Sequence, residues 1–448
     1  MTVEFKASDF FYPVSILKLK RFFDKSQWFS HDELIEYQEK KLREIIFHAY
    51  NNVPYYNELF NKLKLKPHDI RSLQDLKKLP LLTKQDLKAN FKKLQAKNMH
   101  LFKPKLMHTS GTTGERVSFY IDKPSNVLEF VYYWRYWGWA GYKLGNRFAE
   151  FSSYFFMKNE KKSNDLYYFN RLSNRLLLNS LFLSEEKADS LLEVIKKYRP
   201  LFLKGLPSVL YYFALFLRDK GVSDLHFKAV FSTGEMLLEY QRKLIEKTFS
   251  CKVYDSYGHM ERTVAISECS YGGMHVNQEY GILELLEDKS FMTTEGTFIK
   301  GYGTSLHNLS MPLLRYETGD IFEMFNDKMC GCGRNLPLVN KIIGRENDVI
   351  VTPSGKLITT IFIAFNDMHG IDIGQVVQKE SDKLEVRIVK SKDFSLEDES
   401  LLLKNLRVFT GDELKINVKY LSSVELKNTY NDKFRSVVSS VRSVTVFS

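Results

Sequence analysis

Apolar residues recur at three- and four-residue spacing in the first part of the chain, a pattern typical of an amphipathic helix. Such a repeat runs through residues 32–52 and ends before Pro54; its apolar positions are Leu42, Ile45, Ile46 and Ala49. A second repeat covers residues 184–198, with Ser184 as a candidate N-cap and Pro200 after its end. The pattern predicts a helix over each of these segments.

Strand and helix patterns alternate in the middle of the chain. The string LHFKAVFSTGE (225–235) is typical of a buried strand that ends in a Gly turn. YQRKLIEKTF (240–249) has the pattern of a helix, and CKVYDSYG (251–258) that of a second strand ending in Gly. This alternation predicts parallel strands with crossover helices, whose ligands bind beyond the carboxyl ends of the strands. Both Gly turns are therefore expected at a ligand site.

The pattern changes after about residue 345. An alternating strand is predicted at 384–390, a helix at 395–407 and another strand at 414–420. We therefore expect an α/β protein with a large domain over residues 1–345, built from mixed or parallel sheets with crossover helices. A small, mobile α+β domain is expected over residues 346–448.

The composition of the chain indicates a globular protein that does not cross a membrane. With 448 residues and 44% hydrophobic content, the chain is long enough for about two or three globular units. No apolar run approaches the roughly 18 residues that span a bilayer, and the N-terminus lacks a signal-peptide pattern. We expect a cytoplasmic protein that does not cross a membrane. The formal net charge is +11, but the basic residues are scattered, so we expect no nucleic-acid partner. A polyanionic substrate, a nucleotide and an anionic membrane surface are each compatible with this charge.

The string HTSGTTGERVSFY (108–120) combines glycines with hydroxyl side chains. Its backbone amides and hydroxyls are suited to wrap polyphosphate oxygens, and the residues concerned are Thr109, Ser110, Gly111, Thr112, Thr113 and Gly114. The string is not a Walker loop, because GxxxxGK[ST] is absent. The alternative is a surface turn rich in Ser, Thr and Gly.

Further strings follow in a fixed order: STGE (232–235), YGHME (257–261), RYETGD (315–320) and GREND (344–348). This series resembles the adenylate-forming superfamily, in particular the branch that contains phenylacetate-CoA ligase and the CapK proteins of capsular polysaccharide loci. LREIIFHAYNNVPYY (42–56) also resembles the N-terminal region of that branch. The resemblance therefore covers nearly the full length.

The resemblance implies a role for each string. Residues 109–114 would hold the phosphates of ATP, and the nucleotide base and sugar would contact Gly234, Glu235, Tyr257, Gly258, Asp320 and Arg345. Gly234 and Glu235 would border the adenine, Tyr257 would stack on it, and Asp320 would accept hydrogen bonds from the ribose hydroxyls. Glu261 is suited to hold a Mg²⁺ ion that bridges phosphate oxygens. The alternatives are a turn aspartate at 320 and a plain surface carboxylate at 261.

Lys433, in the string NDKFRSVVS, matches the family lysine that neutralises charge between the carboxylate and the α-phosphate during adenylation. The alternative is a solvated surface lysine.

The resemblance places the hinge of the small domain at residues 346–348, where Asn347 stands instead of the more usual Asp or Lys. Two more departures are Arg116-Val117 in place of Pro-Lys after the phosphate loop, and Asn431-Asp432 in place of a Gly before Lys433.

The chain has four cysteines, too few for a disulfide framework. Cys269 and His275 lie in ECSYGGMH, and Cys330 and Cys332 lie in CGCGRNLP. Three thiolates and an imidazole form the closed tetrahedral set that structural zinc prefers, and CapK-like sequences show similar strings. The alternative is that these are inert core residues, since Cys-x-Cys is less specific for zinc than Cys-x-x-Cys. Cys251 is expected to pack in the interior.

We therefore expect an enzyme that joins a carboxylic acid to AMP with release of pyrophosphate and then transfers the acyl group to a nucleophile, with the CoA thiol as the leading acceptor. Its cofactors would be ATP and Mg²⁺, with CoA and a structural zinc as further candidates. Aromatic residues at 130–142 and 202–207 are candidates for the acyl pocket, although core and helix packing is the favoured explanation for each individual aromatic. One alternative acceptor is an amine or hydroxyl of a sugar in surface polysaccharide synthesis. The other alternative is a non-catalytic nucleotide-binding assembly protein.

Overall fold

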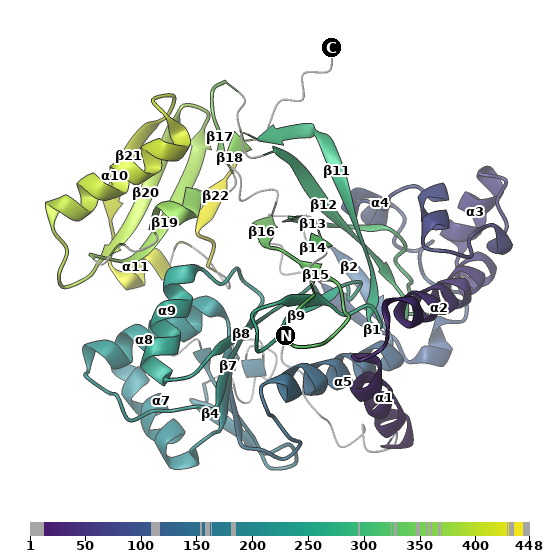
Figure 1. The fold of residues 1–448 in the computed structure, drawn as a ribbon, viewed down its shortest axis with the longest axis horizontal. Coiled ribbons are helices and arrows are strands. Elements are labelled where there is room, and N and C mark those ends of the chain that lie inside the picture. Colours follow the sequence, from purple (N-terminus) through teal and green to yellow (C-terminus); the bar gives the residue numbers. More distant parts are fainter. Residues whose placement is uncertain are drawn as a thin grey trace.

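The computed structural model describes residues 13–441 except 109–116, 153–154, 157–161, 163, 181–184, 294–295, 324, 327–328, 346–349, 355–356, 359–360, 366–367, 369, 428 and 430–433. Three groups of elements surround the centre of the molecule (Figure 1). They are the N-terminal helices in purple, a set of teal helices over a large sheet, and a small yellow-green C-terminal sheet with its helix.

The N-terminal part begins with α1 (Pro13–Ser26), α2 (His31–Asn52), α3 (Pro54–Lys62) and α4 (Lys84–Ala89), with 3-10 turns at Pro67–Asp69, Gln74–Lys78 and Met99–Phe102. The helix predicted at 32–52 is confirmed. Ser30 caps α2 in a capping box with Glu33, and the apolar repeat of the sequence is buried in a core shared with Tyr316. The hairpin of β1 (Lys105–His108) and β2 (Ser118–Ile121) follows, and then α5 (Lys123–Trp139).

The largest sheet has ten strands in the order β14-β15-β10-β9-β8-β7-β6-β3-β5-β4. Their bounds are β3 (Phe148–Phe151), β4 (Tyr167–Asn170), β5 (Arg175–Leu178), β6 (Phe202–Gly205), β7 (Ala229–Thr233), β8 (Val253–Gly258), β9 (Ala265–Glu268), β10 (Met274–Val276), β14 (Phe325–Asn326) and β15 (Leu338–Val339). The strands from β5 through β3, β6 and β7 to β8 run parallel. The helices between them are α7 (Glu185–Tyr198), α8 (Pro207–Asp219) and α9 (Glu239–Phe249).

This parallel centre confirms the predicted alternation of strands and crossover helices. Every position of β3, β5, β6 and β7 is buried, as expected for strands whose two faces are both covered. The helix predicted at 184–198 is confirmed as α7, while its candidate cap Ser184 lies outside the described residues.

A second sheet has six strands in the order β16-β13-β12-β11-β18-β17. Their bounds are β11 (Gly281–Thr293), β12 (Gly296–Ser305), β13 (Tyr316–Phe322), β16 (Ile342–Arg345), β17 (Ile350–Val351) and β18 (Leu357–Ile358). Asp320 of β13 pairs with Arg345 of β16. β17 and β18, which follow the boundary expected at residue 345, pair back onto β11, and that boundary remains a prediction.

The C-terminal sheet has four strands in the order β21-β20-β19-β22. Its elements are β19 (Ile371–Glu380), β20 (Lys383–Lys390), α10 (Leu396–Thr410), β21 (Lys415–Tyr420), α11 (Ser423–Lys427) and β22 (Val437–Ser439), with a 3-10 turn at Ile361–Phe365. The strand–helix–strand pattern predicted from 384 to 420 is confirmed. Ser395 caps α10 through a capping box with Asp398.

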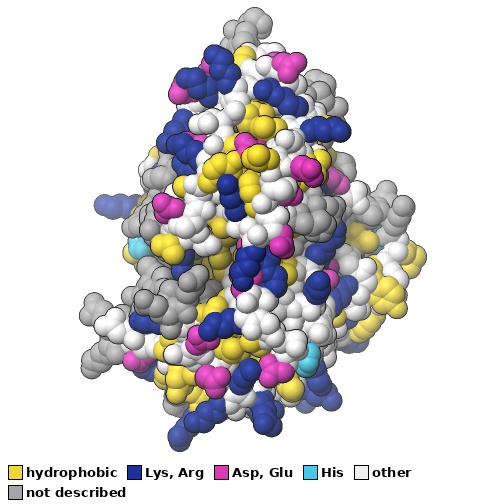
Figure 2. All heavy atoms as spheres, turned by 90° about the vertical axis from the view of Figure 1, so that its left-hand side faces the viewer, with side chains coloured by type: hydrophobic (Ala, Val, Ile, Leu, Met, Phe, Trp, Pro, Cys, Tyr) yellow, Lys and Arg dark blue, Asp and Glu magenta, His cyan; other side chains and the backbone are white. Residues whose placement is uncertain are grey.

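The C-terminal part of the chain packs on α8. Four residues from β19, β20, α11 and the segment before β22 belong to the same buried core as Leu210, Phe213 and Leu217 of α8; they are Ile373, Val389, Leu426 and Phe434. Arg218 of α8 also forms an ion pair with Asp372, with N–O distances of 3.0 and 3.3 Å. Basic and acidic side chains are interspersed over the face that shows the small domain above the α7–α9 region (Figure 2). Among the described residues, no helix has both the length and the apolar composition that spanning a membrane requires.

Candidate nucleotide site and metal centre

The two Gly turns predicted at the ligand site lie at one edge of the ten-stranded sheet. β7 and β8 are parallel neighbours, and Thr233 pairs with Ser256. Gly234 directly follows β7 with a φ of 87°, in the left-handed region that favours glycine. Gly258 is the last residue of β8. Both turns are therefore at the carboxyl ends of neighbouring parallel strands, where a ligand of such a sheet binds.

Tyr257 and Asp320 come from different sheets and meet at this edge. The Tyr257 hydroxyl donates to Oδ2 of Asp320 over 2.6 Å, and Asp320 is buried. The Tyr257 ring contacts Phe322 edge to face, with ring centroids 5.5 Å apart. The hydrogen bond joins the end of β8 to the TGD segment within β13, so two strings that are widely separated in the sequence form one site.

Glu261 is buried in the same region, which excludes a plain surface carboxylate. Its Oε1 accepts a 2.8 Å hydrogen bond from the Tyr316 hydroxyl, and its Oε2 lies 3.1 Å from Nδ1 of His259. Burial by itself raises the pKa of Glu261, but the hydrogen bond and charge of His259 and the hydrogen bond from Tyr316 lower it to about 2. A carboxylate that stays ionised is suited to the Mg²⁺ role expected of it.

His259 and Tyr316 were not predicted as site residues, although both lie inside strings that were singled out. The His259 ring also contacts Thr263, whose Oγ1 lies 3.0 Å from its Nε2. The chain Thr263–His259–Glu261–Tyr316 therefore fixes the orientation of the carboxylate. The string YGHME contains His259, but only the fold shows that the Tyr316 hydroxyl, which comes from β13, reaches the Glu261 carboxylate.

Lys84 is a further residue that sequence reasoning missed. The isolated parallel bridge between Leu82 and Tyr316 brings the start of α4 to β13. A Cβ on Gly319, which has a φ of 76°, would lie 2.6 Å from Nζ of Lys84. The positive φ favours glycine at this position of β13, and the Lys84 ammonium lies beside the Gly319 backbone. The string TKQD predicts the start of a helix, but no local pattern places that start at this turn.

Glu235 joins the start of α8 to the segment that precedes β22. Its Oε2 accepts from the backbone amide of Ser208 at 3.0 Å, and its Oε1 accepts from the backbone amide of Phe434 at 2.9 Å. Ser208 lies in the first turn of α8, and Phe434 lies in the small domain directly after Lys433.

Several expected site residues lie outside the described residues. They are Thr109, Ser110, Gly111, Thr112, Thr113, Gly114 and Arg116, the hinge candidates at 346–348, and Lys433 with Asn431 and Asp432. The base of the phosphate loop is described: His108 pairs with Ser118 across the β1–β2 hairpin, and their side chains lie 2.9 Å apart. Arg345 is described as the last residue of β16, opposite Asp320, and nothing is described of its side chain.

The candidate acyl-pocket aromatics of α5 lie mostly in the interior. Tyr132, Tyr133, Tyr136 and Trp137 are buried in one core cluster with Phe202. This favours the packing interpretation for these side chains. Lys204, in the second candidate segment, is also buried, and its Nζ lies 3.1 Å from Oε1 of Glu150.

The structure brings the four candidate metal ligands together, although they come from strings about sixty residues apart. The ligand atoms of Cys269, His275, Cys330 and Cys332 all lie within 4.8 Å of one another. Sγ of Cys269 is 3.5 Å from Sγ of Cys330, and Sγ of Cys332 is 3.2 Å from Nε2 of His275. Nδ1 of His275 lies 3.0 Å from the Leu336 carbonyl oxygen, which leaves Nε2 to face the thiols. Three thiols and one imidazole fit a structural zinc ion.

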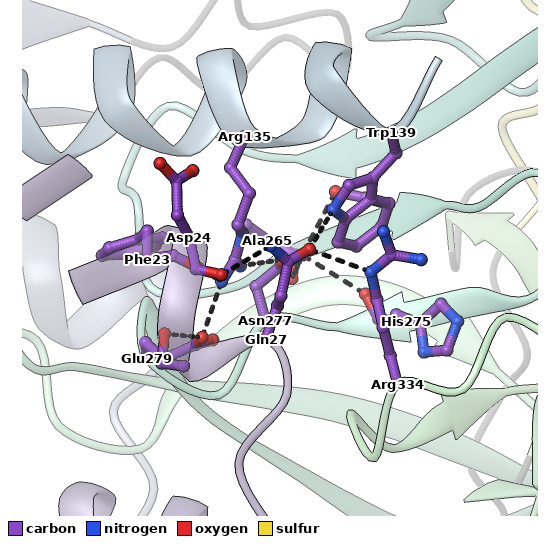
Figure 3. A network of polar contacts seen from close by, with 12 residues as sticks. Phe23, Asp24, Gln27, Arg135, Trp139, Ala265, His275, Asn277, Glu279 and Arg334 are labelled. Atoms are coloured by element: carbon purple, nitrogen blue, oxygen red, sulfur yellow. Dashed lines mark hydrogen bonds and ion pairs between the residues drawn. The ribbon is translucent and has the colours of Figure 1, made fainter. Parts of the chain in front are cut away.

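A polar and aromatic network joins this centre to the N-terminal helices (Figure 3). Arg334, two residues after Cys332, lies over the Trp139 ring at 4.3 Å and donates to Oε1 of Gln27 at 3.0 Å. Trp139 also donates to that oxygen, at 2.8 Å. Deeper in the network, Arg135 of α5 forms a buried 2.6 Å ion pair with Glu279. The CxC loop is therefore anchored to the segment between α1 and α2.

The fold and this site define a class. The chain superposes on 2-hydroxyisobutyryl-CoA ligase in its postadenylation state with a TM-score of 0.72 and 18% identity, over 92% of this chain and 90% of that ligase. The same ligase in its thioesterification state gives a TM-score of 0.57, so the overall arrangement is nearer to the former. The fold is that of the adenylate-forming ligases, which are AMP-forming acid ligases.

Sequence comparison identifies the branch. The chain is 25% identical to protein CapK of Staphylococcus aureus over 383 residues, which cover 84% of this chain and 82% of CapK. It is 24% identical to phenylacetate-coenzyme A ligase of Thermus thermophilus, over 71% of this chain and 72% of that ligase. Residues 350–440 match the family model of the CapK C-terminal domain. The chain is homologous to CapK and to the phenylacetate-CoA ligases, as the order of its strings predicts.

Proposed function

We propose that the chain activates a carboxylic acid with ATP. A carboxylate oxygen attacks the α-phosphorus, pyrophosphate leaves, and an acyl-AMP is formed; the thiol of CoA then attacks the acyl carbon and AMP leaves. The observation that carries this proposal is the convergence of Tyr257, Asp320 and Glu261 at one sheet edge. Their chemistry matches a purine face, a pair of ribose hydroxyls and a metal-bound polyphosphate.

Each of these residues would contact a different part of Mg·ATP. The Tyr257 ring offers an aromatic face to adenine, and Asp320 offers carboxylate oxygens to the ribose. Glu261 would hold Mg²⁺, which neutralises phosphate charge when it is bound. The cation that the usual lysine of the phosphate loop supplies would come from Arg116 or from Lys84, whose ammonium lies beside Gly319. A cation and a metal on the same polyphosphate favour pyrophosphate as the leaving group.

The experiment that tests this function is a substrate screen. Purified protein is incubated with Mg·ATP and a panel of carboxylic acids, with and without CoA, and pyrophosphate release is measured. We expect release that depends on one class of acid and that increases when CoA is added. If no acid supports release and calorimetry detects no nucleotide binding at any Mg²⁺ concentration, the proposal is wrong. Nucleotide binding without any acid-dependent release would instead support a non-catalytic assembly protein.

A second acceptor of the acyl group should also be tested, because the C-terminal part of the chain is similar to a domain of CapK. Residues 350–440 match the CapK C-terminal domain, and the resemblance to CapK suggests surface polysaccharide as the setting. In this version the acyl-AMP is formed in the same way. An amine or hydroxyl of a sugar then attacks the acyl carbon in place of the CoA thiol, and AMP leaves. Replacing CoA by UDP-linked amino sugars in the same screen separates the two acceptors. The product is then an amide or ester, which mass spectrometry identifies.

Asp320→Ala should weaken the binding of Mg·ATP by about tenfold to a hundredfold, because a carboxylate that accepts hydrogen bonds from two ribose hydroxyls is lost. Titration calorimetry measures this directly. Tyr257→Phe is the matched control: it removes the hydroxyl that donates to Asp320 but keeps the aromatic face, so its effect should be several-fold smaller. Equal affinity for wild type and Asp320→Ala would contradict the assignment of the ribose site.

A further inference from the structure

We infer that the cavity between α1 and α5 is a second small-molecule site, and that it takes an organic anion with an aromatic ring. The cavity has a volume of about 370 Å³, near the lower end of the range typical of small-molecule sites. It therefore suits a ligand of one or two rings. The lining residues that carry the inference are Trp134, Gly138, Trp139, Tyr142, Lys143 and Arg334.

The cavity lies at the opposite edge of the ten-stranded sheet from the candidate nucleotide site. α5 begins near that site, because Arg262, which directly follows the YGHME string, donates to Oδ1 of Asn126 at 2.7 Å. An α-helix rises about 1.5 Å per residue, so Gly138 lies about 18 Å further along α5. Beyond the end of α5, Tyr142 packs on Phe148, the first residue of β3. A ligand here is remote from the proposed chemistry, so the inference does not depend on the proposed function.

A glycine inside α5 keeps the cavity open. Gly138 follows Trp134 by one helical turn on the same face, and a Cβ at Gly138 would meet no heavy atom within 4 Å. Glycine in a helix interior is less stable than alanine, and neither a positive φ nor crowding requires it here. The missing side chain leaves open space beside the half-buried indole of Trp134.

Aromatic side chains form much of the cavity wall. Trp134 and Trp139 are half-buried, whereas Tyr142 is buried. In Figure 3, Arg135 and Trp139 extend from α5 toward the segment that carries Gln27, and the Trp139 indole nitrogen donates to Oε1 of Gln27 at 2.8 Å. Indole and phenol rings favour flat apolar partners, in offset or edge-to-face contact. The wall therefore suits a ligand with an aromatic ring.

The charges around the cavity favour an anion. Two of its four cations have carboxylate partners; they are Lys20, paired with Asp24, and Arg135, paired with Glu279. The other two, Lys143 and Arg334, form no ion pair with any carboxylate that the structure describes. The expected zinc ion with three thiolates beside Arg334 would offset one of these charges. One positive charge remains, which suits a ligand with one negative charge.

Arg135 adds a donor to this wall. The side chain is buried, and its Nε has no hydrogen-bond partner among the described residues. Its two terminal nitrogens are occupied by Glu279 and Asn277. A buried donor without a partner is unfavourable, and a carboxylate oxygen of a ligand is an acceptor that would satisfy it.

The test uses the tryptophans of the full chain as probes. The sequence contains four, at positions 28, 134, 137 and 139, so labelling with 5-fluorotryptophan gives four fluorine NMR signals. Variants that each replace one tryptophan by phenylalanine assign them. The titrant is benzoate, its neutral analogue is benzamide, and phenyl phosphate distinguishes a phosphate from a carboxylate as the anionic group.

Benzoate should shift the signals of Trp134 and Trp139 in a saturable way. The signal of Trp137 should move far less, because that side chain is buried in the core. Benzamide should bind about tenfold or more weakly than benzoate, since it has no charge to pair with the lining cations.

Gly138→Leu should weaken benzoate binding by about tenfold or more, because the new side chain occupies the cavity. Its unfolding midpoint should equal or exceed that of wild type, since leucine replaces glycine in a helix. Lys143→Ala should weaken benzoate binding by about threefold, as expected for one partly exposed charge. Lys18→Ala is the matched control: it removes an exposed cation of α1 that does not line the cavity, and benzoate binding should be unchanged.

Three results would overturn the inference. One is the absence of any saturable shift at Trp134 and Trp139 with either anion. Another is wild-type affinity for benzoate in folded Gly138→Leu protein, which would place the ligand elsewhere. The third is equal binding of benzamide and benzoate, which would contradict selection for an anion. Tighter binding of phenyl phosphate than of benzoate would support the anion site and identify its anionic group as a phosphate.

Discussion

Lys433→Ala should lower the rate of acyl-AMP formation by on the order of a hundredfold or more. In the proposed reaction the ammonium neutralises charge that develops between the attacking carboxylate and the α-phosphate, and a charge contact of this kind in a desolvated site contributes roughly 3 kcal/mol. Single-turnover measurement of acyl-AMP with the acid from the screen checks this. The consumption of supplied acyl-AMP should change far less, because rotation about the hinge expected at residues 346–348 would then have moved Lys433 away from the acyl-AMP.

The matched control for this variant is Lys427→Ala. Lys427 is the last residue of α11 in the same small domain, so its loss removes a positive charge close by in the sequence without touching the predicted catalytic position. It should leave both half-reactions within about twofold of wild type. A comparable loss in both half-reactions for Lys433→Ala would mean that Lys433 serves folding or domain docking instead of adenylation.

The protein should contain about one zinc per chain when it is purified without chelators, as expected for a closed set of three thiolates and one imidazole. Elemental analysis of the purified chain measures this. Cys269→Ser should remove the metal and lower the free energy of unfolding by about 3 kcal/mol or more, because binding of a structural zinc contributes directly to folding. The loss appears as a lower midpoint in thermal and denaturant unfolding.

Cys251→Ser is the control for the zinc prediction. Cys251 is a free thiol outside the cluster, and burial raises its pKa to about 12, as expected of an inert packed residue. It should leave the zinc content unchanged. Protein that carries no zinc, or Cys269→Ser protein that keeps its full metal content, would contradict the assignment.

Much of the fold could be predicted because local patterns agree with it. The apolar repeat of α2, the buried run of β7 and the alternation of β20 each show in a short stretch of sequence the face that the element buries. The long β11–β12 hairpin was not predicted. Its strands pair over many residues, but the connecting sequence TTEG (293–296) lacks the short Asn-Gly or Asp-Gly signal that identifies a hairpin.

The candidate site was predicted from motifs, and the geometry that joins those motifs was not. Tyr257 and Asp320 were singled out separately, but only the packing of two sheets shows that they share a hydrogen bond of 2.6 Å. No sequence pattern identified Lys84 as a residue near the site, because its position depends on a single bridge from Leu82 to Tyr316. Glu235 was predicted to border a nucleotide, whereas its partner Phe434 lies at the far end of the chain. Contacts between distant segments depend on the assembled layers, which no local pattern contains.

The core shared by α8 and the small domain should make the rate of domain opening depend on temperature in a characteristic way. Ile373, Leu426 and Phe434 are buried there against α8, and rotation of the small domain about the hinge expected at residues 346–348 would expose them to water. Exposure of apolar surface raises the heat capacity, so a plot of the logarithm of the rate of this step against reciprocal temperature should curve. Because apolar contacts weaken on cooling, domain opening becomes easier relative to bond making as the temperature falls. The step that limits turnover is therefore expected to shift from opening toward chemistry in the cold.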